Sequence, residues 1–475
     1  MTSQPTPNTT EDLVVVLPGI MGSTLRKGDD QVWGTGLPTV LSTVVSRLKT
    51  IKPEGHPHPD YQDDVWADGL IGGIQMIPGL WTIQLGYDGL LKRLESVLGR
   101  KAAIYRSAAP PAQQLDPPAS GLIAFPYDWR LSNRVNADRL DKVLQVALPK
   151  WQGLDHRDAR VTFICHSMGG LVARWFAQCC PGGSDMTRRI ITIGTPHRGA
   201  LRALDQLMHG ARIGKGPFQL KFSEFARSLP STYELLPEYA CIQRPGSPAP
   251  DLISIADYGV ENLQDLDSLL TRKGLEFLAT LNEKPASTLQ ILPIVGTRQP
   301  TLTTMDVTGS TFTAVDQISE ADEAGDGTVP RLSATPNGME TGNPVIHWTA
   351  DKHGALQHNR SVLDQLEGAL SVYPAHKGPG GADLSVQIDE FVIAGESIPV
   401  YAEAPGERTL SLEARVIDER GGFILTIPLK PGDGGHKGEV PVLPPGTYQV
   451  IVQGYRAASA LVAPVTSLIA VLDAT

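Results

Sequence analysis

The stretch Phe163-Ile-Cys-His-Ser-Met-Gly-Gly170 is the most informative part of this chain. It begins as an apolar run with the character of a β-strand, breaks at His-Ser-Met-Gly, and continues with the helical spacing of Leu171, Val172, Trp175 and Phe176. A strand, a sharp turn and a helix in this order form a nucleophile elbow, which lifts a serine hydroxyl above the edge of a sheet. Ser167 is therefore the candidate nucleophile.

The elbow departs from its usual pattern at one position. A glycine usually stands two residues before the serine, and Cys165 stands there in this chain. The crowded turn needs a small side chain, and cysteine is small, so the segment still fits a nucleophile turn. Taken alone, the same residues also fit a strand-to-helix turn without a catalytic role.

Length and composition place the chain among globular proteins of more than one domain. A single core stops growing near ~250–300 residues, and this chain has 475. Its residues are 41% hydrophobic and 19% charged, which allows a large buried core. The formal net charge of -10 argues against binding to nucleic acid and disfavours long-range adsorption to anionic membranes.

The start of the sequence and its cysteines predict a cytoplasmic protein. No basic segment followed by an apolar stretch stands at the start, so no signal peptide is expected, and no apolar run reaches the ~18–20 residues of a membrane span. The four cysteines include the adjacent Cys179 and Cys180 and lack C-x-x-C spacing. We therefore expect reduced, buried thiols without a disulfide or a zinc site.

Short apolar runs that end in Gly, Pro or Asp recur along the chain. They occupy residues 13–17, 122–125, 161–165, 190–193 and 289–295. Helical patterns lie between several of them, such as the one that follows a capping Asn133. Strands that alternate with helices predict a parallel sheet covered on both faces, and the ligands of such sheets bind at the carboxyl ends of the strands.

Two stretches, about residues 26–120 and 200–285, are too long to be plain connections, and we interpret them as cap or lid segments inserted into a catalytic domain at 13–372. The apolar segment 70–85 is broken by Gly and Pro. It fits packing in a core or cap, and it equally fits the wall of an acyl-chain pocket or a lid that touches a membrane. Residues 1–12 are expected to form a disordered tail.

A different pattern follows a Gly- and Pro-rich linker at residues 373–382. From residue 383 to 475, short runs of alternating apolar and polar residues are separated by turn residues every eight to twelve positions. This pattern predicts an all-β sandwich. The stretch Leu443-Pro-Pro-Gly-Thr-Tyr448 resembles the tyrosine corner of immunoglobulin-like domains, although the cysteine pair of antibody domains is absent.

A serine hydroxyl needs an acid and a histidine to activate it, and behind a nucleophile elbow these follow in that order along the chain. Asp326 stands between two glycines in Ala324-Gly-Asp-Gly-Thr-Val-Pro330, which makes it the candidate acid. An aspartate in such a turn also fits the simple closing of an Asx turn. Asp322 and Glu323 are nearby alternatives for the acid.

The candidate base is His353, in the loop Asp351-Lys-His-Gly-Ala355 before the last helix of the domain. A base on a loop beyond a strand end can reach the elbow. His347 is expected to be fixed within a strand, and His358 stands at the start of the helix as the second choice.

The tetrahedral intermediate of acyl transfer needs two backbone N–H donors. Met168, directly after the serine, supplies one. The run Val14-Val-Val-Leu-Pro-Gly-Ile-Met-Gly-Ser23 leads from a strand into a loop in which the N–H of Ile20 is the second candidate, unless the loop is an ordinary turn at a strand end. The candidates for the lining of the substrate pocket are Gly19, Met21, Tyr127, Trp129 and Trp81.

The remaining patterns do not indicate a cofactor or a metal. His56 and His58 have the residue type of metal ligands, but their flanking prolines favour a solvated loop. No phosphate-binding or dinucleotide-binding glycine pattern follows a strand in the proper context.

Six short motifs occur in one order within residues 13–370. They are Leu17-Pro-Gly-Ile-Met-Gly-Ser-Thr-Leu25, Tyr127-Asp-Trp-Arg130, His166-Ser-Met-Gly169, Gly194-Thr-Pro-His-Arg-Gly199, Leu229-Pro-Ser-Thr-Tyr-Glu-Leu-Leu-Pro237 and Gly325-Asp-Gly-Thr-Val-Pro330. Together they resemble the lecithin:cholesterol acyltransferase family, which includes lysosomal phospholipase and phospholipid:diacylglycerol acyltransferase.

The resemblance implies an α/β-hydrolase that cleaves a lipid acyl ester through an acyl-enzyme and passes the acyl group to water or an alcohol. It places the nucleophile on Ser167, the acid on Asp326, the base on His353, and the oxyanion donors on Ile20 and Met168. It also implies that residues 127–130 border the site, although a Trp-Arg pair that packs a strand end explains them as well.

The chain differs from the family pattern in three respects. Cys165 replaces the usual glycine, and residues 26–120 hold no cysteine, so the disulfide-held lid of secreted members is absent. The expected β-sandwich at 383–475 is not part of the family core.

These observations favour a serine ester hydrolase or acyltransferase that acts on an acyl lipid, with a phospholipid at a membrane surface as the leading substrate. One alternative is an inert hydrolase-fold scaffold whose β-sandwich binds a protein partner. Another is an esterase for substrates that are not lipids.

Overall fold

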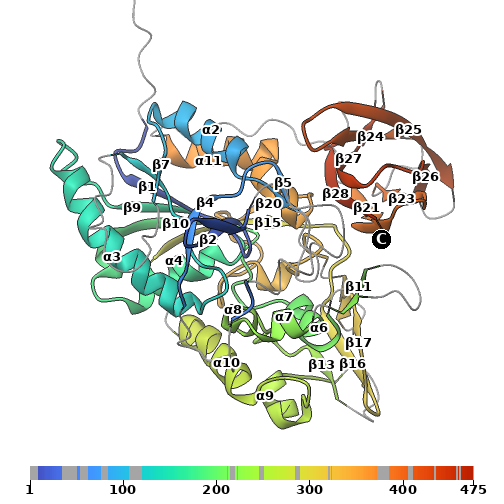
Figure 1. The fold of residues 1–475 in the computed structure, drawn as a ribbon, viewed down its shortest axis with the longest axis horizontal. Helices are drawn as coiled ribbons and strands as arrows, with labels where there is room; N and C mark the ends of the chain where they lie inside the picture. Colours follow the sequence, from blue (N-terminus) through green and yellow to red (C-terminus); the bar gives the residue numbers. More distant parts are fainter. Residues whose placement is uncertain are drawn as a thin grey trace, which may run out of the picture.

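The structure is a computed structural model, shown in Figure 1. It describes residues 9–34, 51–53, 63–75, 84–105, 120–210, 212–213, 220–221, 223–244, 251–283, 289–318, 321–322, 324–371, 384–404, 410–432, 435–455, 458 and 462–473. The expected linker at 373–382 therefore lies outside the described residues.

A parallel sheet of seven strands forms the centre of the domain that the sequence predicts to be the catalytic domain. In spatial order the strands are β20 (His347–Thr349), β15 (Gln290–Gly296), β10 (Thr187–Ile193), β9 (Val161–His166), β1 (Leu13–Leu17), β8 (Leu122–Ala124) and β7 (Ala103–Ile104). All five expected strands are present. Strand β9, which leads to Ser167, lies in the middle of the order.

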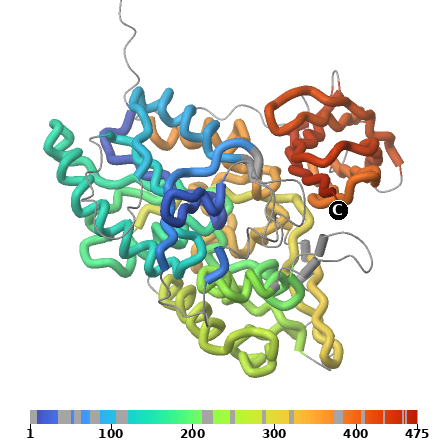
Figure 2. Tube along the Cα trace, viewed as in Figure 1, coloured from blue at the N-terminus to red at the C-terminus, as the bar shows by residue number. Residues whose placement is uncertain are grey.

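Helices cover both faces of this sheet, as the alternation of strands and helices predicted. They are α2 (Asp88–Leu98), α3 (Asn133–Gln152), α4 (Gly169–Cys179) and α11 (Arg360–Leu370). Val15 belongs to the apolar cluster that contains residues of α3 and α4, whereas its neighbour Val14 belongs to the cluster that contains residues of α2 and α11. Because successive side chains of a strand point to opposite faces, a strand buried on both sides reads as a continuous apolar run. Figure 2 shows the blue tube of α2 beside the orange tube of α11, although the two helices are far apart in the sequence.

The first turn of α3 differs in detail from the expectation. Ser132, not Asn133, is the N-cap residue, because its hydroxyl oxygen accepts a hydrogen bond from the N–H of Arg134. Asn133 is the first helical residue, and its N–H donates to the buried carboxylate of Glu234 at 2.6 Å. Two adjacent residues with good capping side chains left the exact start of the helix undetermined by sequence.

Only part of the first expected insertion lies outside the core layers. Residues 23–70 contain a small sheet of β3 (Asp30–Trp33), β2 (Ser23–Lys27) and β4 (Val65–Leu70). From Asp88 onward the chain returns to the domain core, because α2 buries Leu90, Leu94 and Leu98 and β7 is the edge strand of the central sheet. The short strand β7 gave no clear periodic signal in the sequence.

The second expected insertion is largely helical and forms the lower part of the molecule in Figure 1. After the short helix α5 (Gly183–Met186), its helices are α6 (Leu201–His209), α7 (Ser223–Arg227), α8 (Pro230–Tyr233), α9 (Ile255–Tyr258) and α10 (Ser268–Glu283), with the 3-10 turn η2 (Val260–Asn262). A four-stranded sheet of β14 (Leu252–Ile253), β13 (Ile242–Gln243), β16 (Thr304–Thr308) and β17 (Thr311–Val315) lies beside them. The remaining short elements of the domain are β5 (Ile74–Gln75), β6 (Gln84–Leu85), β11 (Arg212–Ile213), β12 (Leu220–Lys221), β18 (Gln317–Ile318), β19 (Ala321–Asp322), η4 (Arg331–Ser333) and η5 (His353–His358).

The C-terminal domain is all-β, as expected. Its strands are β21 (Ser385–Ile388), β23 (Ile398–Glu403), β26 (Gly435–Val440), β25 (Phe423–Gly432), β24 (Leu412–Asp418), β27 (Gly446–Gly454), β28 (Val465–Leu472) and β22 (Phe391–Ile393), in spatial order. One hydrogen-bonded sheet of eight strands curls around its own apolar core, because β25 pairs with β24 along most of its length and with β26 at its end. The expected tyrosine corner is present, since the Tyr448 hydroxyl donates to the carbonyl of Pro444 at 2.8 Å.

The C-terminal domain shares apolar packing with the catalytic domain. Leu468, Ala470 and Leu472 of β28 are at most 4% exposed and belong to the same apolar cluster as the central sheet. Figure 1 shows this domain beside the end of the molecule that holds β15 and β20. The two domains therefore meet over a buried, partly apolar interface.

Residues 9–12, part of the expected tail, pack against the catalytic domain. The N–H of Thr10 donates to the carbonyl of Leu370. Asp12 is buried, and its carboxylate accepts hydrogen bonds from Thr162 Oγ1, Arg160 N and Arg188 Nε at 2.9, 3.0 and 2.9 Å. This carboxylate joins the beginnings of β1, β9 and β10.

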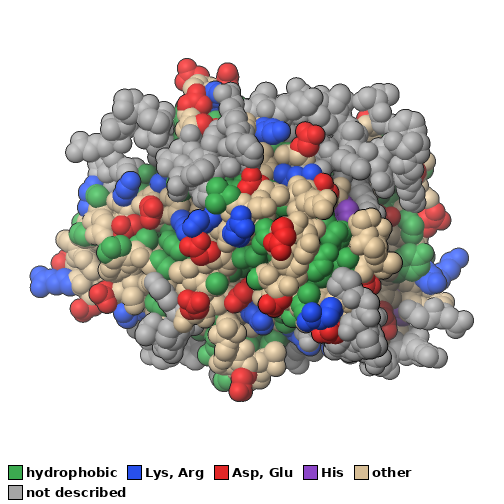
Figure 3. Space-filling view, turned by 90° about the horizontal axis from the view of Figure 1, so that it is seen from below, with side chains coloured by type: hydrophobic (Ala, Val, Ile, Leu, Met, Phe, Trp, Pro, Cys, Tyr) green, Lys and Arg blue, Asp and Glu red, His purple; other side chains and the backbone are tan. Residues whose placement is uncertain are grey.

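The surface carries charges of both signs, and the cysteines form no disulfide. On the face seen in Figure 3, acidic and basic side chains are interspersed with hydrophobic ones. All four cysteines are free; Cys165 and Cys241 are buried, and Cys179 and Cys180 are half-buried. Among the described residues, no helix has the length and apolar character needed to cross a membrane.

Candidate active site

Ser167 lies at the sharp turn between β9 and α4. Its φ is +51°, a left-handed conformation that is costly for a residue with a side chain. The turn is held by two bonds, from Ser167 N to the carbonyl of Ile193 and from Thr195 Oγ1 to the carbonyl of Ser167, both 2.8 Å. A strained residue kept in place by its neighbours is the geometry of a nucleophile elbow.

His353 and Asp326 lie in line with Ser167. His353 Nε2 is 2.9 Å from Ser167 Oγ, and His353 Nδ1 is 2.7 Å from Asp326 Oδ2. The three residues are 7%, 3% and 2% exposed, in the order Ser167, His353, Asp326. A carboxylate only accepts hydrogen bonds, so Nδ1 of His353 carries the proton and Nε2 is left to accept the proton of the serine hydroxyl.

Asp326 closes an Asx turn and also holds the histidine. Its Oδ1 accepts from the N–H groups of Thr328 and Val329 at 3.0 and 2.7 Å, while Oδ2 faces His353. The Asx turn is confirmed through one oxygen, and the other oxygen is placed where a bond to the candidate base requires it. The backbone turn fixes the direction in which the second oxygen points.

The alternative acids and bases have other surroundings or fall outside the described residues. His358 Nε2 donates to the carbonyl of Gly86, and His347 Nε2 is 2.9 Å from Ser361 Oγ. Asp322 is in the short strand β19. Glu323, His56 and His58 lie outside the described residues.

The loop after β1 passes directly over the elbow. A Cβ atom added to Gly19 would lie 2.9 Å from Ser167 Cβ, and one added to Gly169 would lie 2.4 Å from the carbonyl oxygen of Pro18, so both glycines permit a close backbone approach. Ile20 follows Gly19 in this loop, and Met168 precedes the first residue of α4. The two candidate oxyanion donors therefore belong to backbone segments that meet at Ser167.

The expected pocket residues support this loop from behind. Tyr127 donates its hydroxyl to the carbonyl of Pro18 at 2.8 Å, and Trp129 donates its indole N–H to the carbonyl of Ser23 at 3.2 Å. Tyr127 and Trp129 are 2% and 0% exposed, and Met21 is also buried, with a φ of +59°. Their burial and their hydrogen bonds favour the structural explanation.

The segment expected to form a wall of the acyl-chain pocket is only partly described. Residues 76–83 of the apolar segment 70–85, including Trp81, lie outside the described residues. Arg130, the last residue of the Tyr127–Arg130 motif, is buried and forms ion pairs with Asp128 and Asp63 at 2.8 and 2.7 Å. That arginine therefore packs the strand end.

His166 and Tyr87 form a hydrogen-bonded bridge that no sequence pattern predicts. The Tyr87 hydroxyl accepts from the N–H of Gly19 at 2.8 Å and donates to His166 Nδ1 at 2.9 Å. His166 Nε2 in turn donates to the carbonyl of His353 at 3.1 Å. This chain connects the loop of Gly19 to the backbone of the candidate base.

The protonation states of His166 and Tyr87 agree with the hydrogen bonds of this bridge. Burial, followed by the neighbouring His353, lowers the pKa of His166 to about 3, so this imidazole is neutral at physiological pH. Burial also raises the pKa of the Tyr87 phenol well above its ordinary value. A neutral imidazole with one donor and one acceptor is what the two hydrogen bonds of His166 require.

Two further glycines surround the acid and the base. A Cβ atom added to Gly194, whose φ is +58°, would lie 2.9 Å from Asp326 Oδ2 and 3.1 Å from His353 Nδ1. One added to Gly296 would lie 2.4 Å from Asp326 Cβ. Gly194 stands in one of the six sequence motifs, but only the folded structure brings it to this pair.

The arrangement brings a hydroxyl, an imidazole and a carboxylate into one hydrogen-bonded line, beside two converging backbone segments. This set of groups is sufficient for acyl transfer without a metal or a cofactor. Among the described residues, no cluster of His, Cys, Asp or Glu has the composition of a metal site.

Comparison with known proteins supports the resemblance drawn from the motifs. Residues 117–284 match the family model of lecithin:cholesterol acyltransferase. The matched segment contains Ser167 and Met168, whereas Ile20, Asp326 and His353 lie outside it. The seven-stranded parallel sheet is consistent with the α/β-hydrolase fold of that family.

The other comparisons add no functional information. The crystal structure of an engineered protein is 12% identical, with 97% of this chain and 100% of that chain covered, but its TM-score of 0.17 supports no argument. No curated protein matches the chain significantly.

Proposed function

We propose that this chain, whose residues 117–284 match the lecithin:cholesterol acyltransferase family, is a serine hydrolase or acyltransferase that cleaves an ester of an acyl lipid. The observation that carries the proposal is the hydrogen-bonded line from Ser167 through His353 to Asp326. The family match favours a lipid ester, and within that class we propose a phospholipid as the substrate. A membrane surface is then the natural place of encounter.

In the proposed reaction, Ser167 Oγ attacks the carbonyl carbon of the ester while His353 Nε2 takes the hydroxyl proton. Asp326 stabilises the imidazolium that forms and keeps its ring in place. The negative charge of the tetrahedral intermediate falls on the former carbonyl oxygen, which the N–H groups of Ile20 and Met168 would stabilise. Collapse of the intermediate breaks the ester bond, and His353 gives its proton to the departing alkoxide.

The acyl group is then bound to Ser167 as an ester. Water or an acceptor alcohol attacks it, with His353 again taking the proton of the attacking hydroxyl and returning it to Ser167 Oγ. Attack by water yields a free fatty acid, and attack by an alcohol yields a new ester. Product analysis with and without an added long-chain alcohol distinguishes hydrolysis from transfer.

The proposal is tested with a fluorophosphonate probe and a panel of phospholipids and short-chain esters. We expect wild type to be labelled and to release fatty acid from phospholipid, and Ser167→Ala to lose the labelling and on the order of 10⁴–10⁶ in kcat while remaining folded. Persistent labelling of Ser167→Ala would contradict the assignment of the nucleophile. Turnover of short-chain esters alone would instead indicate an esterase for substrates that are not lipids.

The other candidate is an inert scaffold whose C-terminal domain binds a protein partner. It rests on the appended β-domain and on Cys165 at the elbow, and it predicts a wild-type protein that neither reacts with the probe nor turns over any ester. The close approach of Ser167, His353 and Asp326 favours the enzyme.

A further inference from the structure

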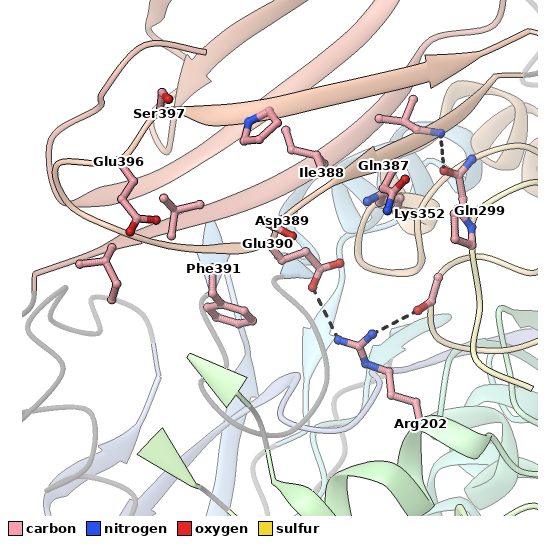
Figure 4. A pocket seen from close by; sticks show the side chains of 16 residues that line it. Arg202, Gln299, Lys352, Gln387, Ile388, Asp389, Glu390, Phe391, Glu396 and Ser397 are labelled. Carbon is pink, nitrogen blue, oxygen red and sulfur yellow. Dashed lines mark hydrogen bonds and ion pairs between the residues drawn. The ribbon is translucent and has the colours of Figure 1, made fainter. Parts of the chain in front are cut away.

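The C-terminal domain touches the loop that carries Asp326 through Gln299. The buried Gln299 amide donates from Nε2 to the carbonyl of Leu384 at 3.0 Å and accepts on Oε1 from the N–H of Val386 at 3.1 Å. Strand β21 is an edge strand, so the side chain pairs with its open edge as the peptide group of another strand would. Figure 4 shows Gln299 bonded to this edge.

The backbone of Gln299 is tied to the acid loop. Its N–H donates to the carbonyl of Gly325 at 3.0 Å, and its carbonyl accepts from Thr301 Oγ1 at 2.7 Å. Thr301 Oγ1 in turn accepts from the N–H groups of Gly325 and Gly327 at 2.9 Å each. Gly325 and Gly327, which flank Asp326, are therefore hydrogen-bonded to the segment 299–301. The side chain of Gln299 in turn connects this segment to the C-terminal domain.

A second contact reaches the loop that carries His353. Asp351 is buried, and its Oδ1 accepts from the N–H of Thr466 in β28 at 3.0 Å and from the N–H of Lys352 at 2.9 Å. Its Oδ2 accepts from Asn359 Nδ2 at 3.0 Å. Asp351 thus connects the C-terminal domain to both ends of the short segment that contains His353.

The acid and base loops are also joined to each other, because the N–H of His353 donates to the carbonyl of Asp326 at 2.8 Å. A third, longer contact links Arg202 to both sides of the interface, with Nη1 3.4 Å from the carbonyl of Gly327 and Nη2 3.9 Å from Glu390. These residues border a pocket of about 430 Å³ between the domains (Figure 4).

We propose that the C-terminal domain is a positioning element of the active site, which holds the Asp326 loop through Gln299 and the His353 loop through Asp351. The inference rests on the proposed function, because it assigns these contacts to the same catalytic groups. Catalysis by oriented groups is sensitive to displacements of about 1 Å, which can cost ~10²-fold in rate. Backbone donors on two different strands of one rigid sheet fix both loops relative to each other.

The sharpest variant is Thr466→Pro, because proline has no backbone N–H and therefore removes the donor to Asp351. The N–H of Thr466 points to Asp351, on the side of β28 away from β27, so the substitution leaves the pairing with β27 in place. Thr466→Ala is the matched control, since it shortens the side chain and keeps the donor. At the contact with β21, Gln299→Met keeps a side chain of similar length and removes both hydrogen bonds that the Gln299 amide makes with Leu384 and Val386.

The full-length proteins are compared by thermal melting, by the rate of fluorophosphonate labelling, and by kcat and KM on the best ester of the panel. We expect Thr466→Pro and Gln299→Met each to lower kcat and the labelling rate by about 10-fold, with KM within about twofold of wild type. Thr466→Ala is expected to retain the wild-type kcat. A purely structural role would change the melting temperature without separating kcat from KM.

Wild-type kcat in folded Thr466→Pro and Gln299→Met would overturn the inference, as would an equal loss in Thr466→Ala and Thr466→Pro. If Thr466→Pro does not fold, Gln299→Met decides the question alone. Failure of the proposed function looks different, because wild type itself would then show neither labelling nor turnover.

Discussion

The hydroxyl of Tyr87 lies 2.9 Å from Nδ1 of His166 and also accepts the N–H of Gly19 at 2.8 Å. Tyr87→Phe removes this oxygen and leaves a buried N–H and a buried imidazole nitrogen without their partner. We expect a loss of about 1–3 kcal/mol in the free energy of unfolding and a 10- to 100-fold lower kcat, because the loop of Gly19 is no longer fixed over Ser167. Urea unfolding and steady-state kinetics measure the two effects.

Tyr105→Phe is the matched control for this variant. Tyr105 is also buried, but its ring stacks on Phe125 at a centroid distance of 5.3 Å, away from the bridge. The control should retain the wild-type kcat. An unchanged kcat in Tyr87→Phe would show that the bridge does not position the site.

The strain at Ser167 predicts that the nucleophile is held at a cost in stability. A glycine adopts the φ of +51° without strain, so Ser167→Gly should be more stable than Ser167→Ala by about 1 kcal/mol. Both variants should be equally inactive, since neither has a hydroxyl. Equal melting temperatures of the two variants would argue against strain at this turn.

Substitution of Gly194 should affect both the candidate site and the backbone, and a control glycine distinguishes the two effects. In Gly194→Ala the new methyl group would stand 2.9 Å from Asp326 Oδ2 and 3.1 Å from His353 Nδ1, so the acid and base must move apart. We expect at least a 100-fold lower kcat together with a loss of stability of about 1–3 kcal/mol.

Gly182→Ala is the control for that change, because Gly182 also has a positive φ, +73°, and no atom lies within 4 Å of the added Cβ position. It should lose stability through backbone strain and keep its activity. A normal kcat in Gly194→Ala would mean that the pair tolerates the methyl group.

Glu234 should contribute a loss of stability as the pH rises. Burial raises the pKa of this carboxyl to about 7 from its ordinary value of 4.5, so the folded state binds its proton more tightly than the unfolded state. The contribution of Glu234 to the free energy of unfolding should therefore fall as the pH rises from 4.5 to 7, by on the order of 3 kcal/mol. The buried His166, whose pKa burial lowers to about 3, contributes in the opposite direction below pH 6.5, so the effect of Glu234 is measured as a difference between two proteins.

Glu234→Gln should remove this contribution, as measured by urea unfolding of both proteins at several pH values. Asp351, whose pKa burial raises to about 6, and the buried His166 titrate in wild type and variant alike, so their contributions cancel in the difference. A difference between the two proteins that stays constant from pH 4.5 to 7 would exclude Glu234 as a source of pH dependence.

The central sheet and the candidate site were predictable from sequence because their signals are local. The run from Leu13 to Leu17 is apolar at every position, since both faces of β1 are buried, and the elbow motif identifies Ser167 within five residues. Asp326 and His353 followed from their order and from glycine-rich loops. The structure places His353 beside Ser167 and Asp326 beside His353.

The supporting contacts could not be predicted, because each joins residues far apart in the chain. Tyr87 is 79 positions from His166, and Asp351 is 115 positions from Thr466. Nothing in the sequence near Tyr87 or Gln299 distinguishes these residues from ordinary core or loop residues. Tyr127 and Trp129, candidates for the pocket lining, illustrate a related limit, because sequence does not show that both side chains are buried.

Asp12 stabilises the central sheet at the end opposite to the elbow, because its carboxylate connects the beginnings of three strands by hydrogen bonds. A shortened version of the protein that begins after this residue would keep every reacting group yet lose that tie. Poor yield or a low melting temperature of such a truncated protein should therefore be attributed to the lost hydrogen bonds of Asp12 and not to a change in the candidate catalytic residues. Expression tags are better placed ahead of residue 9, so that this end of the sheet stays intact.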